Sequence, residues 1–195
     1  MKTDKKKYNA HAKRTKEWEK AYYIYENLYM ELNTPPALRF GESLTEEEIN
    51  RFYKEMIDEC DYFYPAYLDL GMSKLKRTYE PAKKILDKGF DLLIQIGTKK
   101  EKQELFDKIV DNLERLWRWD LIAEYAEKLI ELHPRNVDFI DIAAFSYGQI
   151  GKEKAIELGQ KAVKIAPRNK FYANNLGWIY LLFNHKDKAR EMFDT

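Results

Sequence analysis

Histidine and cysteine often mark catalytic or metal sites, and this chain contains few of either. The three histidines, His11, His133 and His185, are far apart, and none has a carboxylate at metal-ligand spacing on the same expected helix face. The single cysteine, Cys60, excludes an intramolecular disulfide and a cysteine-based zinc site. No HExxH motif, phosphate-binding glycine loop or nucleophile elbow is present. We therefore predict no catalytic residue, no metal site and no cofactor, and a protein that is not an enzyme.

Charge is distributed unevenly along the chain, although the net charge is only +1. Residues 1–20 contain eight Lys/Arg and three Asp/Glu, whereas residues 41–61 contain eight acids and two bases. Residues 1–11 are expected to form a basic disordered arm, which lacks the apolar segment of a signal peptide. No run reaches the ~18 apolar residues that a membrane span needs. Together with the lone cysteine, these features predict a cytoplasmic protein that binds neither nucleic acid nor membrane.

Apolar residues recur with helical spacing along most of the chain, and prolines and glycines fall mainly where helices are expected to end. Ser43 with Glu46, and Thr98 with Glu101, match the capping-box pattern at a helix start. Gly97 is expected to end the preceding helix in a left-handed conformation. The chain is therefore predicted to be all-α. Helices are expected near residues 12–33, 44–62, 65–77, 80–96, 99–116, 119–133, 137–149, 152–165, 170–183 and 186–194.

Pairs of these helices repeat one pattern. The first helix of each pair has apolar or small residues at spacings 0, 3, 4 and 7, and the second has a small residue near its start. The first core residues of four successive units are Tyr67, Phe106, Ile140 and Ala173, separated by 39, 34 and 33 residues. One such pair cannot bury its apolar face alone, so the pairs are expected to stack.

The repeat resembles the tetratricopeptide repeat (TPR), whose period is about 34 residues. Its pattern is best matched by YLDLG at 67–71, YEPA at 79–82 and LGWIY at 176–180. The resemblance implies a right-handed α-solenoid of antiparallel helix pairs. Its expected parts are N-terminal helices forming a degenerate repeat over 12–64 and TPR-like repeats over about 65–98, 99–135, 136–168 and 169–195.

In TPR proteins the first helix of each pair lines the concave surface, so the resemblance also implies which residues contact a partner. The inner surface is expected to be acidic, with an apolar and amide patch toward the C-terminus. Counting along each first helix from its first core residue also places Ile142 and Glu114 on this surface. Asn175 holds the position at which superhelical members grip a peptide backbone. The candidate partner-binding residues are Asp69, Met72, Asp107, Asp111, Asp141, Phe145, Asn174, Asn175 and Trp178.

The predicted function is a protein-interaction scaffold that binds a partner polypeptide in the concave groove. Acids on the inner surface predict a Lys/Arg-rich partner segment, and they would repel the carboxylate terminus that some TPR proteins clamp. The acids could instead be merely solvated, and Phe145 and Trp178 could contact a neighbouring helix pair. The cluster at 62–64 and Trp117 with Trp119 are expected in the core. The alternative function is self-association, or docking to a larger assembly or enzyme, through an uncapped C-terminal end.

Overall fold

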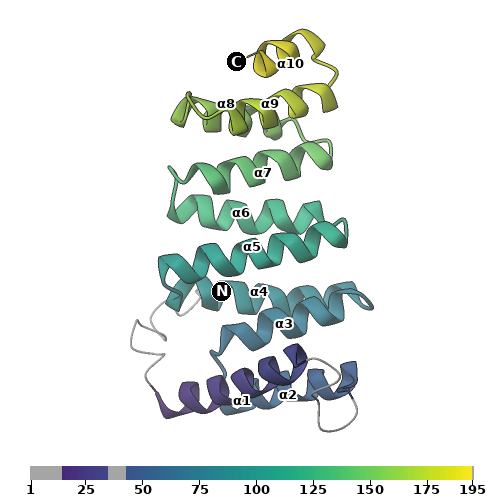
Figure 1. The fold of residues 1–195 in the computed structure, drawn as a ribbon, viewed down its shortest axis with the longest axis vertical. Coiled ribbons are helices and arrows are strands. Elements are labelled where there is room, and N and C mark those ends of the chain that lie inside the picture. The colour runs from purple at the N-terminus through teal and green to yellow at the C-terminus, as the bar shows by residue number, and fades with distance from the viewer. Residues whose placement is uncertain (1–14, 35–42, 195) are drawn as a thin grey trace. The chain divides into compact units, whose positions relative to one another are not determined.

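Residues 15–34 and 43–194 are described by a computed structural model, and this part of the chain contains ten α-helices and no strand (Figure 1). The predicted basic arm at 1–11 and the prolines at 35 and 36 lie outside the described residues. The all-α prediction is confirmed, and most predicted helix ends lie within two residues of the observed ones. The helices are α1 (Lys16–Asn33), α2 (Glu46–Glu59), α3 (Tyr64–Leu75), α4 (Tyr79–Ile96), α5 (Lys99–Arg115), α6 (Trp119–Leu132), α7 (Val137–Gln149), α8 (Lys154–Ile165), α9 (Lys170–Leu182) and α10 (Lys186–Phe193).

Capping boxes begin α2 and α5, and the one at α2 was predicted at the wrong residues. Thr98 and Glu101 cap α5 as expected: the Glu101 amide donates to Thr98 Oγ1 at 3.2 Å, and Glu101 Oε2 accepts from the Thr98 amide at 2.8 Å. At α2 the same pair of bonds joins Thr45 and Glu48, not Ser43 and Glu46. Since α2 begins only at Glu46, Ser43 lies two residues too early to cap it.

Two other helix boundaries are also set by local chemistry. Gly97 was predicted to be left-handed, but it is extended, with φ −67° and ψ 140°, so that prediction is wrong. A side chain at Gly97 would instead meet the Leu93 carbonyl oxygen at 2.4 Å. Asparagine side chains cap the two helices that matter most below: Asn136 accepts from two amides of α7, and Asn169 accepts from the Phe171 amide of α9.

The chain divides into two compact units, residues 1–106 and 107–195. In the first unit α1 packs on α2, α2 on α3, and α3 on α4. The α3–α4 crossing is close because glycine faces the partner helix from both sides. A Cβ on Gly71 would lie 2.6 Å from Leu86 Cγ, and one on Gly89 would lie 2.8 Å from Tyr67 Cβ. These contacts explain why small residues recur at fixed places in the repeat.

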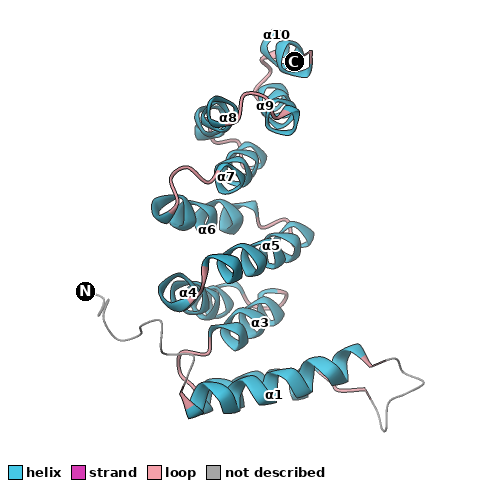
Figure 2. Ribbon diagram, turned by 60° about the vertical axis from the view of Figure 1, so that its left-hand side comes forward, coloured by secondary structure: helices cyan, strands magenta, loops and turns pink. Residues whose placement is uncertain are grey.

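In the second unit each helix from α6 to α9 packs on the next one along the chain, and α7 also contacts α9 (Figure 2). Ile140 and Ala173, the predicted first core residues of these pairs, are buried. Gly177 lies against the Phe193 ring, so that a Cβ there would be 2.5 Å from it. The direct α7–α9 contact brings together the first helices of two successive pairs, which are the helices predicted to bind.

Trp117 contradicts its predicted place in the core. It lies in the turn between α5 and α6, its side chain is 78% exposed, and its φ of 55° is in the left-handed region. The turn is closed by the Arg118 amide, which donates to the Leu113 carbonyl. Trp119, by contrast, is half-buried. In the cluster at 62–64, Phe63 and Tyr64 are in the core as predicted, whereas Tyr62 is half-buried. Within residues 15–34 and 43–194, no helix is both long enough and apolar enough to cross a membrane.

Candidate functional site

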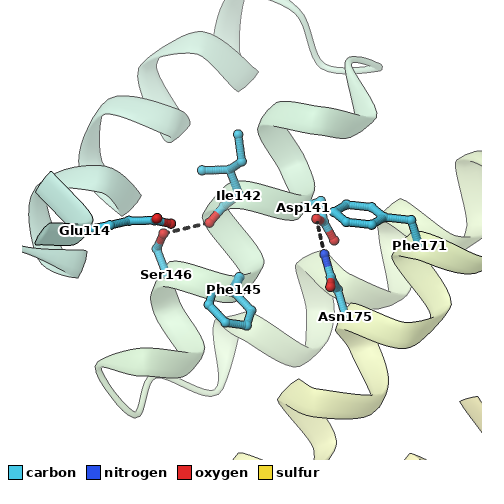
Figure 3. A pocket seen from close by; sticks show the side chains of 7 residues that line it. All are labelled: Glu114, Asp141, Ile142, Phe145, Ser146, Phe171 and Asn175. Carbon is cyan, nitrogen blue, oxygen red and sulfur yellow. Dashed lines mark hydrogen bonds between the residues drawn. The ribbon is translucent and has the colours of Figure 1, made fainter. Parts of the chain in front are cut away.

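A hollow of about 220 Å³ lies in the second unit, bordered by the first helices of successive pairs (Figure 3). Its side chains come from the C-terminal end of α5, from one face of α7 and from the first turns of α9. Three of them, Asp141, Phe145 and Asn175, are residues predicted to bind a partner. The lining residues are Glu114, Asp141, Ile142, Phe145, Ser146, Phe171 and Asn175.

The helical period explains how these side chains meet. Asp141 and Phe145 are four residues apart on α7, and Phe171 and Asn175 are four apart on α9, so each pair projects from one face of its helix. The asparagine caps fix where both helices begin. The contact between α7 and α9 then places the two faces side by side.

Asp141 and Asn175 form the polar centre of the hollow. Asn175 Nδ2 donates to Asp141 Oδ2 at 2.7 Å, as the dashed line in Figure 3 marks. Asp141 is only 5% exposed, and among the described residues its other oxygen, Oδ1, is buried and accepts no hydrogen bond. Burial raises the pKa of Asp141 to about 6; the Asn175 bond opposes this rise, and the nearby charge of Asp138 adds to it.

Aromatic and acidic side chains surround this centre. The Phe145 ring packs edge-to-face on Trp119, with centroids 5.8 Å apart. Phe171 is 61% exposed, and its ring lies edge-on to that of Tyr172 at 5.5 Å. Glu114 borders the hollow from α5 with an exposed side chain, and the partial burial of its carboxyl raises its pKa, with a smaller contribution from Asp111. The hollow therefore combines two rings with two carboxyl groups whose charged forms are disfavoured by burial.

The hydroxyl group among the lining side chains, that of Ser146, already donates a hydrogen bond within its own helix. Ser146 is buried, and its Oγ donates to the carbonyl oxygen of Ile142 at 2.7 Å within α7. Neither Ser146 nor Phe171 was among the predicted binding residues. Phe171 could have been found from the sequence, since it precedes Asn175 by one helical turn. Ser146 carried no comparable signal.

Four predicted residues of the second unit lie outside the hollow. Asp107 and Asp111 are exposed on α5, and Asn174 and Trp178 are exposed on α9. The Trp178 ring packs edge-to-face on Phe193, with centroids 5.6 Å apart. The structure thus brings together three of the seven candidates in this unit and leaves four on the surrounding surface.

Asp69 and Met72 belong to the first unit, on α3. Asp69 is half-buried, and the Tyr25 hydroxyl of α1 donates to its Oδ2 at 2.9 Å. Burial, with the Asp69 charge second, raises the pKa of Tyr25. Met72 is also half-buried. Asp69 is therefore held by α1 of its own unit. Among the described residues of the chain, no three His, Cys, Asp or Glu side chains are grouped to hold a metal ion.

Comparison with known proteins supports the fold through solved structures only. No protein-family model and no curated protein matches the chain. MamA from Desulfovibrio magneticus RS-1 (41-end) matches with a TM-score of 0.56 at 19% identity, over 90% of this chain and 92% of that one. YrrB, described as a TPR protein with an unusual peptide-binding site, matches with a TM-score of 0.51 at 20% identity, over 76% and 75%. These likenesses confirm the predicted fold class.

Proposed function

We propose, since the chain has the tetratricopeptide-repeat fold, that it is a protein-interaction scaffold that binds an extended segment of a partner polypeptide. The proposed binding surface is the face formed by α5, α7 and α9 in the second unit. A stack of helix pairs offers a long continuous surface for such a segment. YrrB is described as having a peptide-binding site, and the proposal gives this chain a comparable role.

The hollow between α5, α7 and α9 is the observation that carries the proposal. Binding sites in proteins are concave and largely apolar, with a few polar groups that fix orientation. Phe145, Phe171 and Ile142 supply the apolar walls, and Asp141 with Asn175 supplies the polar centre. A side chain of the partner segment would enter this hollow, while the segment itself would lie along the helices.

The charge of this surface favours a basic partner. Glu114 and Asp141 line the hollow, and Asp107 and Asp111 are exposed beside it on α5. Such a surface attracts Lys/Arg side chains and repels nucleic-acid phosphates, so we propose a protein partner with a Lys/Arg-rich segment. The proposed setting is the cytoplasm, for which the lone cysteine, Cys60, is the argument.

Selection of random peptides against the full-length chain tests this function. The exposed ring of Phe171 can be removed with little loss of packing, so Phe171→Ala should weaken the selected peptides at least about tenfold. Ile165→Ala is the matched control, because Ile165 is also exposed but lies on α8, a second helix. No selected peptide, or peptides equally affected by both substitutions, would count against the proposal.

Self-association is a second candidate function, favoured by an apolar cluster on α9 and α10. Trp178, Leu181, Leu182 and Phe193 are large, apolar and exposed. Exposed apolar clusters often mark protein contacts. Sedimentation velocity from 1 to about 100 µM tests this candidate; concentration-dependent dimers lost in Trp178→Ala would support it, and a monomer throughout would remove it.

A further inference from the structure

The hydrogen-bonding groups of the hollow are arranged to accept rather than to donate. The Ser146 hydroxyl donates to a carbonyl of its own helix, and the Asn175 amino group is turned toward Asp141. A carboxylate can only accept, so this contact points the amide oxygen of Asn175 away from Asp141. A ligand in the hollow therefore meets mainly oxygen acceptors: the carboxylates of Asp141 and Glu114 and the Asn175 carbonyl.

Asp141 Oδ1 is a buried oxygen to which no group in residues 15–34 and 43–194 donates. It is buried in a side chain that is 5% exposed, so bulk water does not satisfy it either. Buried carboxylate oxygens almost always have hydrogen-bond partners, and each exception calls for an explanation. An N–H group brought by a ligand would satisfy this oxygen.

The aromatic side chains of the hollow indicate which kind of hydrogen-bond donor a ligand would bring. Phe145 is held against Trp119, whereas Phe171 is exposed at the rim and can turn aside as a side chain enters. Faces of aromatic rings attract cations, and the planar guanidinium group stacks on them better than an ammonium group does. A volume of about 220 Å³ also exceeds that of a few water molecules, at ~30 Å³ each, and leaves room for a long side chain.

We propose that the hollow is a subsite for one arginine side chain of the bound segment. Its guanidinium group would lie between Phe145 and Phe171 and donate to Asp141 Oδ1 and to Glu114. This inference rests on the proposed function and adds to it the residue that the hollow selects. Arginine is favoured over lysine because its fork of donors can reach both carboxylates at once.

The proton affinity of Asp141 is consistent with this subsite. Burial raises its pKa to about 6, since the charged form lacks solvation there. The charged groups that face it, Asp138 on its own helix and Glu114 from α5, are acids, and the Asn175 amide from α9 is neutral. Within the described part of the chain, none of these neighbours is a cation, so an arginine would supply a positive charge and favour the ionised carboxylate.

Binding of small probes to the isotope-labelled full-length chain tests the subsite. The probes are the acetylated methylamides of arginine, lysine and citrulline, the last being a neutral analogue of nearly the same shape as arginine. Chemical shifts of the Asn175 side-chain amide and of the Phe145 and Phe171 backbone amides report on the hollow. We expect the arginine probe to shift these signals with at least about tenfold higher affinity than citrulline, and lysine to fall between them.

Two isosteric variants locate the effect. Asp141→Asn keeps the shape of the side chain but loses one of the two charges, so the preference for arginine over citrulline should shrink several-fold. Glu157→Gln removes the same charge from the exposed surface of α8 and should leave the preference unchanged. Equal binding of arginine and citrulline, or an unchanged preference in Asp141→Asn, would overturn the subsite.

The outcomes separate this inference from the function on which it rests. Selected peptides that depend on Phe171 but show no preference for arginine would support the proposed binding surface and rule out the arginine subsite. An arginine probe that binds the hollow while no peptide can be selected would keep the subsite and remove the peptide-binding role. Failure of both measurements would remove both.

Discussion

Asn175 Nδ2 donates a 2.7 Å hydrogen bond to Asp141 Oδ2, and this bond joins α7 and α9 across 34 residues of sequence. The two residues come from first helices of successive pairs, and the bond between them satisfies only one oxygen of the carboxylate. Burying an acid in this way destabilises the folded chain, and under the proposed function its second oxygen accepts a hydrogen bond from the ligand. The first two predictions measure the folding cost.

Asp141→Asn should stabilise the folded chain at neutral pH. The pKa of Asp141 is raised to about 6 from an ordinary 3.8, so between these values the folded state binds more protons than the unfolded state. Stability is therefore lost as pH rises from about 4 to 6, by up to about 3 kcal/mol, and the loss persists above pH 6. Asparagine has no such charge to bury, and its oxygen can still accept from Asn175.

Urea unfolding at pH 7.5 and at pH 4 measures this effect. The variant should be more stable than the parent at pH 7.5, and the difference should shrink toward pH 4. Glu157→Gln, on the exposed surface of α8, serves as the control and should show no such difference between the two pH values. A variant that is less stable than the parent at pH 7.5, but not at pH 4, would mean that the charged bond to Asn175 outweighs desolvation.

Asn175→Ala should have the opposite effect on stability. Among the described residues, it removes the one side-chain donor to Asp141 and leaves both oxygens of this buried carboxylate without a partner, which costs about 1–3 kcal/mol. Because the Asn175 bond lowers the pKa of Asp141, its loss should also move that pKa further above 6. A carboxyl-carbon NMR titration of Asp141 checks the second effect directly. An unchanged midpoint would show that the bond contributes little.

The two possible capping boxes before α2 can be told apart by alanine substitution. Thr45→Ala should cost about 1 kcal/mol, because Thr45 Oγ1 accepts from the Glu48 amide. Ser43→Ala should change the free energy of unfolding by only about 0.3 kcal/mol or less, since Ser43 is exposed and precedes the helix. Thermal unfolding of both variants provides the comparison, and a larger loss in Ser43→Ala would contradict the observed helix start.

Trp117→Asn should stabilise the turn between α5 and α6. Trp117 adopts φ 55°, where a bulky side chain is strained and asparagine is tolerated. The indole is 78% exposed, so removing it sacrifices little packing, and the expected gain is about 0.5–1 kcal/mol. A higher unfolding midpoint in urea, with an unchanged dependence of the free energy of unfolding on urea concentration, would agree with this prediction. A lower midpoint would indicate that the indole makes a stabilising contact.

Helix positions were predictable because apolar spacing and small residues report directly on each helix pair. Gly71 and Ile140 illustrate this: both have the residue type that a close crossing or a core position needs, and both are buried where the repeat places them. The sequence could not fix a helix start where two capping-box matches lie close together. Ser43–Glu46 and Thr45–Glu48 both match the capping pattern, and only packing of the helix decides between them.

The candidate site was predicted in part. Asp141, Phe145 and Asn175 were identified from their places in the repeat, but the burial of Asp141 was not, because it depends on α9 packing against α7. Asn175 was expected to grip a peptide backbone, whereas its amino group is turned toward Asp141. Trp117 was misplaced because aromatic residues are usually buried, and its turn conformation left no sequence signal.

Mapping a selected peptide on the full-length chain by NMR tests the central claim most directly. The account predicts that, on binding, shifts concentrate on α5, α7 and α9, with Phe145, Phe171 and Asn175 among the strongest. Shifts confined to α6, α8 and α10 would contradict it, because the partner would then lie on the second helices and leave the hollow empty.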